Sequence, residues 1–315
     1  MQRDARRRTR TPGSSTVLQA YALCAFVVVF YAGNILVGKA VNELPPVTIA
    51  FTRLVIAFAV LLPFGWRSAW TARRSFMEHA RPLLLMSATG VAFFTSFIYG
   101  ALQFTSATNV SVLEALIPAV TVALSFVVLH ERLRPIQWAG VAVSLAGAVS
   151  VVMDGNLLAL SAVVWNKGDG IMVGAILCWA VYSVTVRRHL GHFPEWGALV
   201  VMTGLSILML APFVVAEWLV VGEVPLQPGP HWWGLVYLGV FPSVIGLAFY
   251  NRAVATIGAS QAAAFLNLLP VVTMAGAFVF LAEAVSVAQM VGAALVMVGV
   301  FVTLRSRRDT PRGHQ

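Results

Sequence analysis

Residues 101–152 read ALQFTSATNVSVLEALIPAVTVALSFVVLHERLRPIQWAGVAVSLAGAVSVV. This stretch carries two apolar runs, 108–130 and 135–153, and a short polar turn that ends at Pro135 separates them. A helix needs about 20 apolar residues to cross the roughly 30 Å hydrocarbon layer of a membrane. Both runs have that length, so the stretch predicts two membrane-spanning helices joined by a tight turn.

The same pattern extends over the whole chain of 315 residues. Apolar residues make up 59% of it and charged residues only 10%, whereas a soluble domain is about 25% charged. So few charges cannot cover a soluble surface, which argues against a soluble enzyme, a disordered protein and a coiled coil. We therefore expect an all-α integral membrane protein with ten transmembrane helices, at 17–38, 47–66, 83–103, 108–130, 135–153, 169–187, 196–217, 232–251, 260–281 and 286–304.

The basic residues predict how these helices are oriented. Of the 21 Lys and Arg residues, 18 fall in the two tails and the even-numbered loops, whereas only Lys39 and Lys167 lie on the other side and Arg53 lies within a span. Basic residues mark the cytoplasmic side of a membrane protein. We therefore expect both tails, 1–16 and 305–315, to lie in the cytoplasm of a cell with a bacterial-type inner membrane. The net charge of +9 then reflects topology and contact with the lipid bilayer, and it does not indicate nucleic acid as a partner.

The chain contains an internal repeat. A shift of 152 residues aligns 101–150 with 253–302, and fifteen of the 50 positions are identical without gaps. The matches include Pro118 with Pro270 and a glutamate and a glutamine in each half, which chance similarity between apolar segments does not readily produce.

The repeat divides the chain into two units of five spans, 17–154 and 169–304, joined by a periplasmic linker at 155–168. Because five is an odd number, the second unit must enter the membrane from the opposite side. Inverted repeats of this kind are common among secondary transporters, in which they permit alternating access to a central site. A channel or a membrane-embedded enzyme is the alternative for such a repeat.

Residues 33–64, GNILVGKAVNELPPVTIAFTRLVIAFAVLLPF, resemble the first half of an EamA repeat of the drug/metabolite transporter superfamily. Residues 101–152 resemble its second half, through an A-x-x-F-T-S-A opening, the mid-helix Pro118 and a Glu-Arg-Leu turn followed by Pro135. The second unit repeats the two alanines of the opening as Ala253 and Ala259, and it repeats the proline and the glutamate, but Ala284-Val285 replaces the Arg-Leu of the turn. The resemblance covers nearly the whole chain and implies a ten-helix carrier of small organic metabolites.

Two charged residues lie within predicted spans, Arg53 in the second and Glu114 in the fourth. An unpaired charge at membrane depth costs at least about 2.5 kcal/mol, so such residues are candidate sites. Both fall in the outer third of their spans, which permits a buried ion pair. Glu114 is alternatively a proton site or a site for a substrate amine. Its repeat mate is Leu266, so two symmetric carboxylates are not expected.

The other candidate residues indicate an aromatic-rich and weakly charged substrate cavity. Pro118 and Pro270 lie in the middle of spans four and nine, where a proline bends a helix, and we expect them to act as hinges or to line the cavity. Neither the histidines nor the cysteines form a pattern typical of a metal or cofactor site, and none is expected. The candidate cavity residues are Asn34, Tyr99, Gln103, Trp179, Tyr182 and Asn267.

A stripe of small residues occurs in each of two spans: Gly140, Ser144 and Ala148 in span five, Ala288 and Gly292 in span ten. Small residues spaced by four let helices approach closely. The stripes predict helix packing within one chain, with a homodimer face as the alternative.

Together these features predict a secondary transporter that moves a small-molecule solute, neutral or aromatic amino acids, by alternating access in the direction of export. Two alternatives remain open. One is an exporter of multiple drugs or quaternary cations, and the other is a membrane-embedded enzyme, which would need more clustered acids or bases than Glu114 alone.

Overall fold

The computed structural model of the chain describes residues 14–129, 134–152, 166–222, 229–257 and 265–305. The predicted basic tails and the linker 155–168 lie almost wholly outside these ranges, and so does the Glu-Arg-Leu turn. The described part consists of helices joined by turns, and the described residues contain no strand. Its α-helices are α1 (Ser14–Ala40), α2 (Pro46–Thr71), α3 (Arg73–Glu78), α4 (Ala80–Met86), α5 (Phe94–Leu102), α6 (Ala107–Glu114), α7 (Ile117–Leu129), α8 (Pro135–Val152), α9 (Lys167–His189), α10 (Glu195–Val221), α11 (His231–Val240), α12 (Leu247–Ile257), α14 (Leu269–Phe280) and α15 (Val287–Arg305).

Three shorter helical segments complete the described part. A π-helix, η1 (Ser87–Phe93), joins α4 to α5, and a second π-helix, η4 (Phe241–Gly246), joins α11 to α12. A 3₁₀ turn, η3 (Leu190–His192), follows α9. The two π-helices overlap under the repeat, because a shift of 152 brings 87–93 onto 239–245.

Seven helical stretches of the described residues are long and apolar enough to cross a membrane. They coincide with predicted spans one to four and six to eight. Spans five, nine and ten coincide with shorter apolar helices of the described residues, at Pro135–Val151, Leu269–Phe280 and Val287–Val302. The multi-pass helical prediction is thus confirmed, whereas the count of ten crossings stays a prediction.

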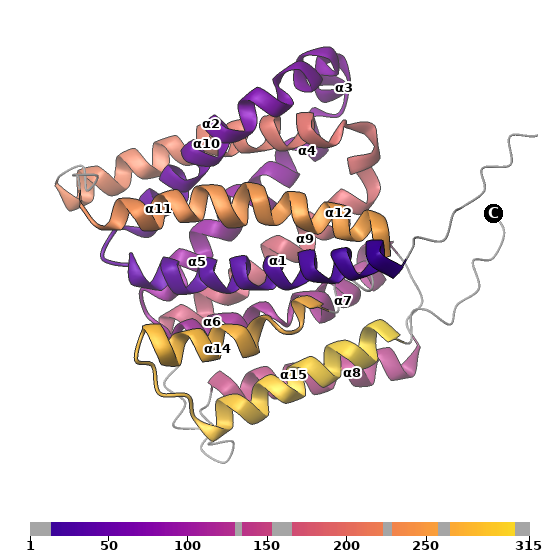
Figure 1. Cartoon of the computed structure of the whole chain (residues 1–315), viewed down its shortest axis with the longest axis vertical. Coiled ribbons are helices and arrows are strands. Elements are labelled where there is room, and N and C mark those ends of the chain that lie inside the picture. The colour runs from indigo at the N-terminus through magenta and orange to yellow at the C-terminus, as the bar shows by residue number, and fades with distance from the viewer. Residues whose placement is uncertain (1–13, 130–133, 153–165, 223–228, 258–264, 306–315) are drawn as a thin grey trace, which may run out of the picture.

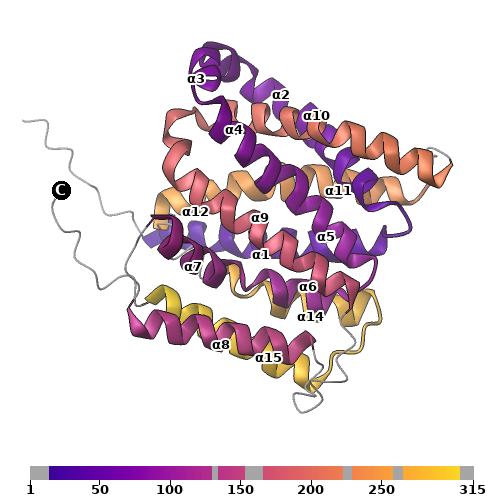
Figure 2. The same cartoon turned by 180° about the vertical axis from the view of Figure 1, so that it is seen from behind.

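The helices lie side by side with their long axes roughly parallel (Figure 1). The pair α8 and α15 forms one edge of the molecule, at the bottom of Figure 1, and α2 packs against α10 toward the other edge (Figures 1 and 2). Helix α1 lies in the middle and contacts α12 and α14, while α9 makes the equivalent contacts with α5 and α7. The helix pairs of the first half therefore have counterparts in the second.

We call the end of the molecule where α1 ends and α2 begins the outer end, following the predicted topology, and the opposite end the inner end. Hydrogen bonds at the outer end join Lys39 of α1 to Thr105, and Thr105 to Asp169 in the first turn of α9. Helix α1 thus ends where its repeat mate α9 begins. The predicted inversion of the two halves requires this arrangement.

The perimeter of the molecule exposes large apolar side chains, among them Leu219, Trp233, Phe278 and Phe280. Soluble monomers rarely expose contiguous apolar patches of this kind. Lipid chains are the solvent that suits such a perimeter.

The small-residue stripes of α8 and α15 pack against each other. A Cβ atom on Gly147 would lie 2.7 Å from the carbonyl oxygen of Gly292, and one on Gly299 would lie 2.5 Å from that of Gly140. Only glycine permits this backbone contact. The interpretation of the stripes as packing within one chain is confirmed for these residues.

Candidate functional site

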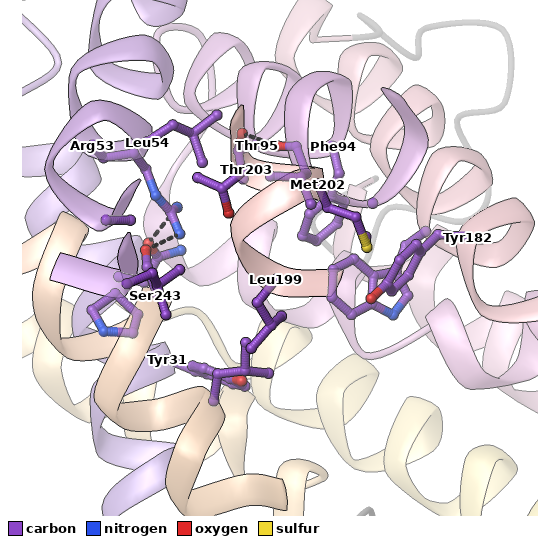
Figure 3. A pocket seen from close by; sticks show the side chains of 18 of the residues that line it. Tyr31, Arg53, Leu54, Phe94, Thr95, Tyr182, Leu199, Met202, Thr203 and Ser243 are labelled. Atoms are coloured by element: carbon purple, nitrogen blue, oxygen red, sulfur yellow. Dashed lines mark hydrogen bonds between the residues drawn. The ribbon is translucent and has the colours of Figure 1, made fainter. Parts of the chain in front are cut away.

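A cavity of about 160 Å³ lies between the two halves of the chain. Its walls come from α1, α2, η1, α5, α6 and α9, and from α10, η4 and α12 on the other side. Figure 3 shows the lining side chains pointing toward one another from these helices. Because both halves contribute, a solute in this cavity would contact both.

The centre of its polar wall is Arg53 of α2, whose side chain is 8% exposed. Its Nη1 donates hydrogen bonds to Asn34 Oδ1 (3.0 Å) and to the hydroxyl oxygen of Tyr99 (2.5 Å), and its Nη2 donates to Ser243 Oγ (2.8 Å, Figure 3). Tyr99 in turn donates to Asn34 Oδ1 at 3.0 Å. All three partners are neutral, so they hold the guanidinium in position and supply no negative charge to it.

The single acidic residue among the lining side chains is Glu114, the last residue of α6. Within the described part of the chain its carboxylate has neither a hydrogen bond nor an ion pair. The ion pair with Arg53 that the sequence permits is therefore not formed here. Both residues nevertheless line the cavity, so the expectation of a weakly charged cavity is corrected: one basic and one acidic side chain face it.

The opposite wall of the cavity is aromatic. The ring centroids of Phe94 and Trp179 are 4.4 Å apart, and those of Trp179 and Tyr182 are 5.1 Å apart. Tyr31 of α1 and Met202 of α10 extend this wall. Such a surface suits an apolar or aromatic group, because rings bury large areas and stack with one another.

Both π-helical segments contribute to the lining. Gly90 belongs to η1, while Pro242 and Ser243 belong to η4. A π-helix carries an extra residue per turn and frequently marks a functional site. The sequence analysis missed Ser243, and the signal that could have found it is the proline that precedes it in the middle of span eight.

The structure brings together most of the predicted cavity residues but not all of them. Asn34, Trp179 and Tyr182 line the cavity, and Tyr99 reaches it through its hydrogen bond to Arg53. Asn267 does not line it and lies in the turn before α14.

Gln103 is also absent from the cavity, because it follows α5 at the outer end. Its Nε2 donates to the carbonyl oxygen of Asn42 at 2.6 Å. Beside it, Lys39 Nζ donates to the carbonyl oxygens of Leu102 (2.7 Å) and Thr105 (2.9 Å). These bonds join α1 to the α5–α6 connection at the outer end.

The two prolines also differ from expectation in one respect. Neither lines the cavity; Pro118 and Pro270 are each the second residue of a helix, α7 and α14, that follows a two-residue turn. Proline suits the first turn of a helix, where no backbone N–H is needed for an intrahelical bond. Each proline thus marks a break in its span, and a hinge at that break stays a prediction.

Two glutamates from the second half bind helix N-termini of the first half at the outer end. Glu217 accepts hydrogen bonds from the backbone N–H groups of Val47 (3.0 Å) and Thr48 (2.7 Å) at the start of α2. Glu283 does the same for the first two N–H groups of α6, at 2.9 and 3.3 Å. A carboxylate at a helix N-terminus satisfies free N–H groups and the helix dipole, so both contacts hold the halves together at this end.

Each end of the molecule has an opening. At the outer end a pocket of about 510 Å³ lies beside Lys39, Gln103 and Glu283, and at the inner end α1, α10 and α12 enclose a groove of about 760 Å³. Trp196 in this groove lies one helical turn from Leu199, which lines the central cavity, and Ala248 follows the cavity residue Leu247 directly. The groove therefore continues along the same two helices that form the cavity wall.

Several known proteins are similar to this chain in sequence or fold. The sequence profile of the EamA-like transporter family matches residues 18–153 and 166–305. The chain is 25% identical over 262 residues to the uncharacterized transporter YyaM of Bacillus subtilis, covering 82% of this chain and 85% of that protein. It is 28% identical over 276 residues to a probable terminal-alkyne amino-acid exporter of Streptantibioticus cattleyicolor, covering 86% and 87%.

Two further similarities extend over most of the chain. A probable amino-acid metabolite efflux pump of Salmonella typhimurium is 24% identical over 297 residues, which cover 90% of this chain and 93% of that protein. A crystal structure aligns with a TM-score of 0.61 at 24% identity and covers 94% of this chain and 99% of the other. At that identity the crystal structure supports the fold alone.

Proposed function

We propose that this chain, which belongs to the EamA-like transporter family, is a secondary carrier. It exports neutral or aromatic amino acids across the inner membrane by alternating access. The observation that carries the proposal is the central cavity, which both halves line and which combines Arg53, Glu114 and an aromatic wall. The names of the Streptantibioticus and Salmonella relatives refer to amino-acid export, and they support the same substrate class here.

Alternating access requires one end of the carrier to close while the other opens. The bonds of Lys39, Gln103, Glu217 and Glu283 close the outer end, and a groove adjoins the cavity helices at the inner end. The hydrogen bonds at the outer end support an inward-facing state as part of this proposal. The basic tails place the inner end in the cytoplasm under the predicted topology, so a solute for export would enter here.

Exchange in proteoliposomes tests the proposed function. Vesicles preloaded with unlabelled L-leucine or L-phenylalanine are expected to accumulate the labelled form of the same amino acid, saturably, whereas vesicles without the protein do not. The same vesicles are given a labelled quaternary ammonium compound. Movement of that cation without movement of either amino acid would reject the proposal and favour the multidrug alternative.

The size of the aromatic wall should set the size of the transported side chain. A Cβ atom on Gly90 would collide with the ring of Tyr182, so Gly90→Ala should push that ring into the cavity. We expect the ratio of L-phenylalanine to L-alanine exchange to fall by roughly tenfold, the effect of about one methylene group in an apolar pocket. Gly170→Ala is the matched control, because a Cβ there meets no atom within 4 Å. An equal loss for both amino acids would contradict this role of Gly90.

A further inference from the structure

We propose that the cavity recognises the zwitterionic head of an α-amino acid, with Arg53 binding its carboxylate, Glu114 binding its ammonium group and the aromatic wall holding its side chain. This inference rests on the proposed function and specifies the ligand of the same site. It assigns the basic and the acidic side chain of the cavity to two separate groups of one solute.

Arg53 has the donors that a carboxylate needs. Its three hydrogen bonds use both N–H groups of Nη1 and one of Nη2, so a second Nη2–H remains. The Nε–H is buried and has no acceptor among the described residues. A guanidinium can bind a carboxylate through two parallel N–H groups, which is the strongest hydrogen-bonding arrangement open to it. Its present partners fix its position and leave this capacity unused.

The burial of Arg53 strengthens the argument. A buried charge is costly unless an opposite charge or several hydrogen bonds compensate it. Asn34, Tyr99 and Ser243 supply hydrogen bonds but no negative charge. An anionic group of a ligand would supply the missing charge without moving the guanidinium.

Glu114 is complementary to Arg53 in the same cavity. Its carboxylate has no donor among the described residues, and it stands at the C-terminal end of α6, where the helix dipole disfavours a negative charge. A primary ammonium group provides a positive charge and three donors. Binding such a group would compensate both the missing hydrogen bonds and the unfavourable dipole.

The two protein charges face one cavity without forming an ion pair, so a ligand that bridges them needs both signs of charge. A zwitterion satisfies both residues and brings no net charge into a low-dielectric site. A simple carboxylate or a simple amine satisfies one residue and leaves the other charge buried alone. A sugar phosphate would bring at least one extra negative charge against a single arginine.

The volume of the whole cavity suits a solute of moderate size. The cavity of about 160 Å³ is comparable to an engineered cavity of about 150 Å³ that binds benzene. The rings of Phe94, Trp179 and Tyr182 form its apolar side. A branched aliphatic or single-ring side chain would fill this part.

Ligand analogues that lack one charge test the inference in equilibrium binding to the purified full-length protein. L-phenylalanine is compared with phenethylamine and 3-phenylpropionate, and L-leucine with isopentylamine and 4-methylpentanoate. We expect each analogue to bind at least about tenfold more weakly than its amino acid, the loss that corresponds to about 1.4 kcal/mol. Analogues that bind as tightly as the amino acids would overturn the inference.

Protein variants assign each charge to its partner. Glu114→Gln should remove most of the preference for L-phenylalanine over 3-phenylpropionate and keep the preference over phenethylamine; Arg53→Gln should do the reverse. Arg53→Lys provides a second test if Arg53→Gln fails to fold, since it keeps the charge and loses the two parallel donors. Glu43→Gln is the control, because Glu43 is exposed at the outer end.

The possible outcomes separate this inference from the proposed function. If the wild-type protein exchanges amino acids but the Arg53 and Glu114 variants weaken all three ligands equally, the charge assignment is wrong and the proposed function stands. If the wild-type protein neither binds nor exchanges any amino acid, both are wrong. Selective loss of one preference in each variant supports the assignment.

Discussion

Replacing both Gly292 and Gly299 by valine is expected to abolish the accumulation of folded protein. A Cβ atom on Gly292 would lie 2.8 Å from the carbonyl oxygen of Gly147, and one on Gly299 would lie 2.5 Å from the backbone nitrogen of Ser144. Backbone atoms cannot rotate away as a side chain can, so α8 and α15 must separate. Overpacking costs about 1–3 kcal/mol per site, and two such sites approach the free energy of unfolding of a whole domain.

The thermal unfolding temperature and the monodispersity of the purified protein measure this effect. The single variants should fold with a lower unfolding temperature, and the double variant should aggregate. The control is Gly170→Val with Gly191→Val, because Cβ atoms at these glycines meet nothing within 4 Å. If the stripe instead formed a homodimer face, the double variant would change the oligomeric state and leave the unfolding temperature of the monomer unchanged.

Replacing both Glu217 and Glu283 by alanine should open the outer end. The two carboxylates accept four backbone hydrogen bonds at the N-termini of α2 and α6, and the double variant would leave these N–H groups without acceptors. Loss of an N-cap interaction costs about 1 kcal/mol. Two such losses should shift the equilibrium between closed and open outer ends by at least about tenfold.

The backbone beside Glu283 adopts an unfavourable conformation that places this carboxylate against α6. Ala282 adopts a φ of 52°, the left-handed region that costs about 1–2 kcal/mol for a residue other than glycine. This turn follows α14 immediately and places Glu283 against α6. The hydrogen bonds of Glu283 to α6 offset part of that cost. Removing them should therefore destabilise the packing of this turn against α6 at the outer end.

A single reactive cysteine can report the opening. Val110 of α6 is fully buried near the outer end, so Val110→Cys, in a background without Cys24 and Cys178, should react slowly with a bulky water-soluble maleimide. The double glutamate variant should react at least about tenfold faster. Glu43→Ala, an exposed glutamate at the same end, should not change the rate. A lower unfolding temperature with unchanged labelling would contradict the proposed closure of this end.

Much of the fold follows from the sequence, because lipid imposes a simple rule on the backbone. Every N–H and C=O at membrane depth needs an internal partner, so the long apolar runs had to be helical, and each predicted span coincides with a helix in the described residues. The repeat also predicted two related units, and the helix contacts of the two halves correspond. The π-helices were missed, since a single extra residue per turn leaves the apolar pattern unchanged.

The candidate site shows where prediction from sequence ends. Arg53 and Glu114 stood out because a charge at membrane depth is costly, and both line the cavity. Their similar depth in the membrane permitted an ion pair between them. Depth does not state the direction in which a side chain points, and the guanidinium is bound to three neutral groups of other helices instead. Gln103 shows the same limit. It was assigned to the cavity, but its amide donates a hydrogen bond to the carbonyl oxygen of Asn42 at the outer end.

The sequence by itself determined the solvent of this protein, the helical character of its segments, its repeat and the two residues that carry charge inside it. Each of these follows from composition and order along the chain. Only the tertiary structure decided that Asn34, Tyr99 and Ser243 hold Arg53 and that Glu114 has no hydrogen-bond partner among the described residues. It also decided that Glu217 and Glu283 cap helices of the other half. These contacts join residues separated by up to 190 positions. They depend on which faces of the helices meet, and side-chain packing between helices sets those faces.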